Sequence, residues 1–130
     1  MSKPTFEQRN GMEVATFADA AQWETWLTEH GSTRRELWLR IARANSGHTT
    51  VTADEALDVC LCYGWIDSLR RSDNDGYFLQ RYSPRRSGSP WSKINAAKVE
   101  ALLAAGRMRP AGLAEVAAAK ATGRWPEDFS

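Results

Sequence analysis

Residues 82–95 read YSPRRSGSPWSKIN and place two adjacent arginines, Arg85 and Arg86, among four serines at a predicted helix start. Ser89 is predicted to cap this helix and Pro90 to occupy its first position, where a missing amide hydrogen has no cost. The free amide hydrogens of a helix start stabilise anions, as guanidinium groups do. The stretch therefore predicts an anion-binding pocket. The alternative is a simple helix cap with both arginines in solvent.

Asp67 is the acid best placed to do chemistry near this stretch. The runs WIDSLRR and YFLQRYS flank the turn-forming SDNDG, which predicts a β-hairpin in which Asp67 faces Arg81. Beside Trp65, Asp67 is a candidate general base, or a group that orients Arg81 toward a ligand. An ion pair that only supports the hairpin is the alternative.

Two tryptophans bracket the charged stretch and predict apolar walls for the pocket. Trp65 follows the preceding helix, Trp91 follows the predicted cap, and Asn95 lies one turn later on the same face as Trp91. We expect one cavity, because small-molecule sites combine apolar walls with a few polar groups. Burial of both tryptophans in the core is the alternative. The predicted ligand-binding residues are Trp65, Asp67, Arg81, Arg85, Ser89, Trp91, Ser92 and Asn95.

The cysteines and histidines predict neither a metal site nor a nucleophile. Cys60 and Cys62 lie in a predicted helix, where they point roughly 200° apart and cannot form a disulfide. His30 and His48 are the only histidines, and no spacing ties either to a cysteine as a zinc site or a catalytic pair requires. No glycine-rich phosphate-binding motif follows a predicted strand. We expect no cofactor and no metal.

Length and charge favour one domain, spanning residues 1–130 with an ordered core at about 17–125. The formal net charge of +1 argues against a general nucleic-acid or membrane binder. Five basic residues and no acid lie between Phe78 and Lys98, so the positive charge is concentrated there. MSKPTFEQRNG contains no apolar run, and no stretch of about 18 apolar residues occurs. We expect a cytoplasmic protein without a membrane anchor.

Hydrophobic periodicity and capping signals predict four helices, one strand and a hairpin. The first helix spans 19–30 and is closed by a left-handed Gly31, and a strand follows at 36–42. The second helix runs from the capping box at 52–55 to Gly64 and leads into the hairpin. The last two helices run from Pro90 to Gly106 and from Pro110 to Gly123. The predicted fold is α+β, with a small and mostly antiparallel sheet of one strand plus a hairpin, packed with about four helices.

Three blocks in this order give the chain a resemblance to a known family. They are CYGWIDS at 62–68, the stretch at 82–95, and GRMRPAG followed by GRW within 106–125, preceded by WETWL in the first helix. Together they resemble the bacterial bacteriocin-protection, YdeI/OmpD-associated proteins from Phe17 to Trp125. The resemblance implies a role in protection against antibacterial peptides or stress, and it implies no reaction or catalytic residue set. It also gives a shared binding site equal weight with a simple helix cap.

Three functions follow, in order of preference. The first is a cytoplasmic bacterial binding or protection protein whose partner is an anionic or aromatic small molecule or peptide, such as an antibiotic or bacteriocin. The alternative is a hydrolase or transferase with Asp67 as general base and the Arg85 helix start stabilising negative charge. Nucleic-acid binding through the basic stretch comes third, because overall charge is near neutral and no known motif occurs. We expect no membrane partner.

Overall fold

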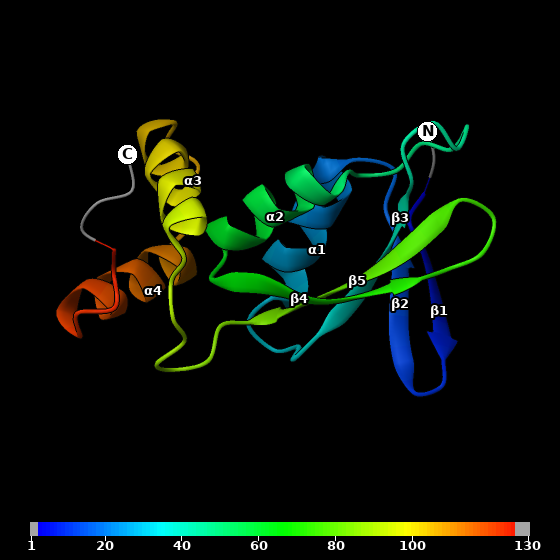
Figure 1. Cartoon of the computed structure of the whole chain (residues 1–130). Coiled ribbons are helices and arrows are strands. Elements are labelled where there is room, and N and C mark those ends of the chain that lie inside the picture. The colour runs from blue at the N-terminus through cyan, green and yellow to red at the C-terminus, as the bar shows by residue number, and fades with distance from the viewer. Residues whose placement is uncertain (1–2, 127–130) are drawn as a thin grey trace.

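A computed structural model describes residues 3–126, which form a five-stranded sheet and four helices (Figure 1). The strands are β1 (Thr5–Arg9), β2 (Met12–Thr16), β3 (Leu37–Ala42), β4 (Trp65–Ser72) and β5 (Tyr77–Pro84), and the helices are α1 (Ala20–His30), α2 (Ala53–Cys62), α3 (Lys93–Ala104) and α4 (Pro110–Ala121). Across the sheet the strand order is β1-β2-β3-β5-β4. The predicted α+β class with four helices is confirmed.

The sheet is larger than predicted and partly parallel. β2 and β3 run parallel because α1 returns the chain to the same end of the sheet, while the other neighbouring strands are antiparallel. β1 and β2 were not predicted at all. They form a hairpin around Asn10 and Gly11, whose φ angles of 50° and 82° suit a tight two-residue turn.

Side-chain alternation along the strands divides the sheet into two unequal faces. α1 and α2 lie over one face (Figure 1), where Leu37, Leu39 and Ile41 join the main hydrophobic core. Trp38 and Leu79 point to the opposite face and form a much smaller cluster with Val14. Most of the apolar burial therefore lies between the sheet and the first two helices.

A second hydrophobic cluster forms where α3 and α4 pack against the end of α2. Gly112 allows this packing, because a Cβ there would lie 2.3 Å from the carbonyl oxygen of Cys62. Gly64 has a positive φ of 78°, and its Cβ position lies 3.0 Å from the carbonyl oxygen of Ala111. The main-chain N–H of Arg109 donates to the Cys62 oxygen at 3.0 Å. The CYGWIDS and GRMRPAG blocks thus meet at a close helix crossing.

The helix boundaries confirm some capping predictions and correct others. The capping box of Thr52 and Glu55 is present at the start of α2, and α4 begins at Pro110 as predicted. Gly31 follows α1, but its φ of −61° is right-handed, so the predicted left-handed cap is wrong. Ser92, not Ser89, caps α3. None of the described helices is both long and apolar enough to cross a membrane.

Candidate functional site

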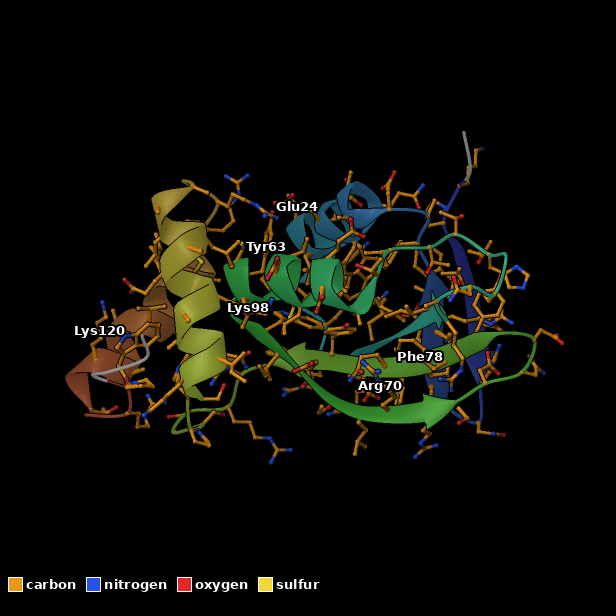
Figure 2. The ribbon with its side chains drawn as sticks, turned by 45° about the horizontal axis from the view of Figure 1, so that its top comes forward. Glu24, Tyr63, Arg70, Phe78, Lys98 and Lys120 are labelled. Atoms are coloured by element: carbon orange, nitrogen blue, oxygen red, sulfur yellow. The ribbon has the colours of Figure 1, made fainter. Side chains whose placement is uncertain are left out.

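A β-bulge in the β4–β5 hairpin changes the predicted pairing of its side chains. Asp67 lies opposite Tyr82 and Arg70 lies opposite Gln80, so the register shifts between them. Arg70 holds the bulge because its Nε donates to Gln80 Oε1 at 2.9 Å, and its guanidinium lies 4.2 Å from the ring centre of Phe78 (Figure 2). The prediction that Asp67 faces Arg81 is wrong, because the hairpin pairs Ser72 with Phe78, two positions away from the predicted register, and the bulge shifts the pairing back by only one.

Arg81 instead pairs with Glu36, just before β3, with 2.6 Å between Arg81 Nε and Glu36 Oε1. Asp67 is half-buried beside Tyr82, and within residues 3–126 it has no ion pair or side-chain hydrogen bond. Burial, together with the neighbouring Cys60 and Asp67, raises the pKa of Tyr82 above its ordinary range. Asp67 therefore faces a protonated phenol and not an arginine.

Where the chain leaves β5, it forms a strongly basic pocket with a volume of about 480 Å³. We call it the arginine pocket, and its polar lining residues are Arg35, Arg81, Ser83, Arg85, Arg86 and Ser87. Four guanidinium-bearing residues and no acid line it. Arg35 and Arg86 are exposed and, within residues 3–126, neither has an ion pair. Of the four pocket arginines only Arg81 has an ion pair within residues 3–126, with Glu36, so the pocket keeps an excess of positive charge.

Arg85 is the most unusual of these residues, because its side chain is buried without an ion pair within residues 3–126. The residue is only 8% exposed, and its guanidinium lies 3.7 Å from the ring centre of Trp91. One nitrogen, Nη2, donates to the carbonyl oxygen of Pro90 at 2.8 Å. Nε and Nη1 are buried without a hydrogen-bond partner, as is Nε1 of Trp91. These three buried nitrogens therefore lack an acceptor. Burial also lowers the pKa of Arg85.

The loop that carries Arg85 is fixed by contacts from α2 and α4. The Arg85 main-chain N–H donates to the Gly64 oxygen at 3.0 Å, directly after α2. Arg124, beyond α4, donates through Nη1 to the Ser89 oxygen at 2.7 Å. The rings of Trp91 and Trp125 pack with 4.9 Å between their centres. The buried guanidinium is therefore held in place from both ends of the loop.

The predicted helix start lies beyond this loop. Ser92 Oγ accepts from the main-chain N–H of Asn95 at 3.1 Å and caps α3, whose first residue is Lys93. Ser89 and Pro90 remain in the loop, so the prediction that they begin the helix is wrong. The positive φ of Gly88, 82°, turns the chain immediately before Ser89 and delays the helix.

The structure brings together only part of the predicted site. Arg81 and Arg85 line the arginine pocket, and Trp91 contacts Arg85 from behind it. Trp65 belongs to the main core, with its ring centre 6.1 Å from that of Trp23, whereas Trp91 belongs to the cluster around α3 and α4. The pocket lining includes neither tryptophan, and it includes none of Asp67, Ser89, Ser92 and Asn95.

Arg35 is the pocket residue that sequence reasoning missed. It lies in the connection between α1 and β3, far along the chain from the basic stretch, and no local pattern marks it. Arg86 and Ser87 belong to the predicted stretch but were absent from the predicted binding residues. Pairing of β3 with β5 brings Arg35 to this end of the sheet.

Comparison with protein families links the chain to a family model. A family model described as a domain of unknown function, DUF8412, matches residues 15–115, from β2 into the first half of α4. No curated protein and no solved structure matches the chain. The matched range contains every residue of the arginine pocket.

Proposed function

Because the chain belongs to the DUF8412 family, whose domain has no known function, we propose from its geometry that it binds an anionic small molecule in the arginine pocket. One observation carries the proposal. Arg85 lines a pocket with three other arginines and no acid, and it is buried with two guanidinium nitrogens unpartnered. A bound anion would give Arg85 the direct ion pair that no acid within residues 3–126 forms with it.

A buried cation without an ion pair is energetically costly. A guanidinium removed from water loses hydration that its neighbours must replace, and unsatisfied donors cost about 1–3 kcal/mol each. A phosphate, sulfate or carboxylate beside several arginines forms charge-assisted hydrogen bonds, often in bidentate geometry. A volume of about 480 Å³ also lies within the range of ordinary small-molecule sites. Size and charge thus favour the same class of ligand.

The proposal includes the protective role implied by the resemblance to the bacteriocin-protection, YdeI/OmpD-associated proteins, with an antibiotic or peptide as the bound molecule. It also includes a cytoplasmic location, which the two buried and unpaired cysteines suit. The anionic character of the ligand is better supported than the aromatic one, because the pocket lining contains no aromatic residue.

The catalytic alternative is weaker than binding. A hydrolase or transferase needs a general base beside the bound substrate, and Asp67 does not line the pocket. Incubation with candidate phosphate esters followed by mass spectrometry tests it, because turnover changes the mass of the compound. Nucleic-acid binding is weaker again, since the net charge is +1 and no known nucleic-acid-binding motif occurs.

Thermal unfolding in phosphate tests the proposal, with chloride at equal ionic strength as the reference. At a ligand concentration of 100 times Kd, binding stabilises the native state by about 2.7 kcal/mol. We expect phosphate to raise the Tm of the wild type and to lose most of this effect in a variant carrying Arg35→Gln and Arg86→Gln. Arg71→Gln is the matched control, because Arg71 lies over Trp38 and outside the pocket. Equal phosphate shifts in all three proteins would contradict anion binding there.

A further inference from the structure

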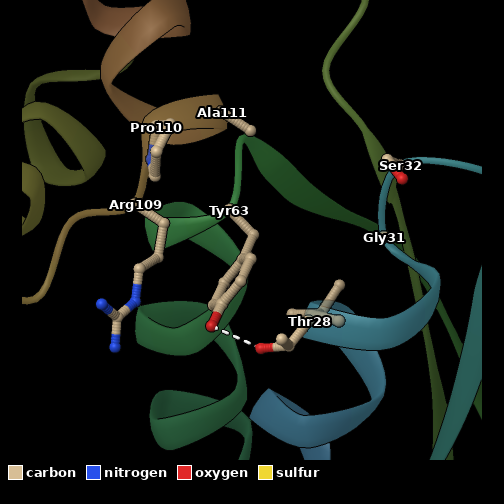
Figure 3. A pocket seen from close by; sticks show the side chains of 8 residues that line it. Thr28, Gly31, Ser32, Tyr63, Arg109, Pro110 and Ala111 are labelled. Carbon is tan, nitrogen blue, oxygen red and sulfur yellow. Dashed lines mark hydrogen bonds between the residues drawn. The ribbon is translucent and has the colours of Figure 1, made fainter.

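A second pocket lies between α1, the end of α2 and the start of α4 (Figure 3). Its volume is about 440 Å³, and it shares no lining residue with the arginine pocket. Its apolar wall consists of Leu27, the Tyr63 ring, Pro110 and Ala111. We call it the α1–α4 pocket. An apolar group of the size of a large side chain fits such a space.

Tyr63 is held rigidly at the side of this pocket. Its hydroxyl donates to Glu24 Oε2 at 3.0 Å and lies 2.8 Å from Thr28 Oγ1 (Figure 3). Figure 2 shows Glu24 and Tyr63 close together on the neighbouring helices α1 and α2. Both hydrogen bonds fix the ring before any ligand arrives, which lowers the entropic cost of binding.

A shallower hollow adjoins the α1–α4 pocket and carries charges of both signs. The two share Thr28, Tyr63 and Arg109, and the hollow adds Glu24 and Glu29 from α1. Arg109 Nη2 lies 3.8 Å from Glu24 Oε2, with both side chains partly exposed, so this ion pair contributes little stability. Arg109 is therefore free to exchange Glu24 for the carboxylate of a ligand.

We propose that the α1–α4 pocket and its hollow bind a free α-amino acid with an apolar side chain. The side chain occupies the apolar space beside Leu27 and Ala111. The carboxylate pairs with Arg109 and the ammonium group pairs with Glu24 and Glu29. An apolar amino acid offers a partner to every charged residue of the pocket and its hollow, and an apolar group to the pocket wall. A simple fatty acid would leave Glu24 and Glu29 without an opposite charge.

Calorimetric titration with L-phenylalanine and two truncated analogues tests the charge requirement. 3-Phenylpropionate lacks the ammonium group and phenethylamine lacks the carboxylate. We expect L-phenylalanine to bind at least about tenfold more tightly than either, because each loses a charge pair worth about 1.4 kcal/mol or more. Arg109→Gln should weaken L-phenylalanine but not phenethylamine, and Glu24→Gln should weaken L-phenylalanine but not 3-phenylpropionate.

A space-filling variant tests the location. Ala111 is exposed in the first turn of α4, so Ala111→Phe fills the pocket without disturbing the core, and we expect it to abolish binding. Ala117→Phe, at another exposed position of α4, is the matched control and should bind like the wild type.

Three results would overturn the proposal. They are no binding of L-phenylalanine or L-leucine at about 10 mM, equal affinity for 3-phenylpropionate, and unchanged binding to Ala111→Phe. The double variant carrying Arg35→Gln and Arg86→Gln should bind L-phenylalanine normally, and Ala111→Phe should keep its phosphate shift. The two proposals can therefore fail separately.

Discussion

Replacing Arg85 by methionine separates a guanidinium kept for binding from one that holds the fold together. Methionine retains an unbranched apolar stem against Trp91 but removes the charge and all five N–H donors. If the guanidinium serves a ligand, its removal should leave the ligand-free protein nearly as stable and should abolish its response to anions.

The expected magnitude follows from the contacts of Arg85. Two buried nitrogens without partners cost about 1–3 kcal/mol each, so their removal recovers about 4 kcal/mol. The variant loses the charged hydrogen bond to Pro90, worth about 1.5–3 kcal/mol, and the contact over Trp91, worth about 2 kcal/mol. Gain and loss nearly cancel, so we expect a change of less than about 1 kcal/mol.

Urea unfolding followed by circular dichroism measures this change, with and without phosphate at constant ionic strength. We expect the ligand-free variant to match the wild type within about 1 kcal/mol, and only the wild type to gain stability from phosphate. A loss of about 3–5 kcal/mol without phosphate is the cost of breaking a compensated buried charge and would refute the reasoning. Full phosphate stabilisation of the variant would refute it as well.

Three further predictions concern the fold. Ser92→Ala should destabilise the protein by about 1 kcal/mol and Ser89→Ala much less, as measured by thermal unfolding, because only Ser92 caps α3. Gly112→Ala should cost more than about 2 kcal/mol in urea unfolding, because the new Cβ meets the Cys62 oxygen at 2.3 Å. Burial raises the pKa of Asp73, but hydrogen bonds from two arginines outweigh it and lower that pKa below its ordinary value. This carboxylate therefore stabilises the protein above about pH 4, and the stabilisation disappears as pH falls through the lowered pKa, so unfolding measured across pH should show less acid destabilisation in Asp73→Asn.

The helices were largely predictable because their signals are local. A capping box, a proline at the first helical position and apolar periodicity depend on neighbours within a few residues. The inward faces of the last two helices were less predictable. Ile94 and Leu113 are 72% and 43% exposed, although both are large apolar residues within helices. Ala96 and Ala119 are buried instead, because close helix packing favours small side chains.

The sheet was harder to predict, because its pairing depends on residues far apart in the chain. Asn10 and Gly11 carry a strong hairpin signal, but the flanking TFEQR is mostly exposed and shows weak alternation. The register at the turn, which pairs Ser72 with Phe78, and the bulge after Asp67 have no clear local signature, and together they place Asp67 opposite Tyr82.

The candidate site was predictable only in part, because it also combines residues that lie far apart in the chain. The acid-free run after Phe78 indicated the cationic loop, and two of the predicted residues, Arg81 and Arg85, do line the pocket. Arg35 joins them only through the tertiary pairing of β3 with β5, and Trp65 leaves the site because the main core buries it. The sequence shows where basic residues cluster along the chain, whereas only the fold shows which distant residues lie together.

The most direct test of the central claim is an NMR titration that follows the Nε–Hε signals of the arginines as pyrophosphate is added. We predict saturable shifts of the Arg85 signal together with those of Arg35, Arg81 and Arg86, all giving one Kd, while Arg71 outside the pocket stays unchanged. Shifts that rise linearly over all arginines, or an unchanged Arg85 signal, would contradict an anion site in the arginine pocket.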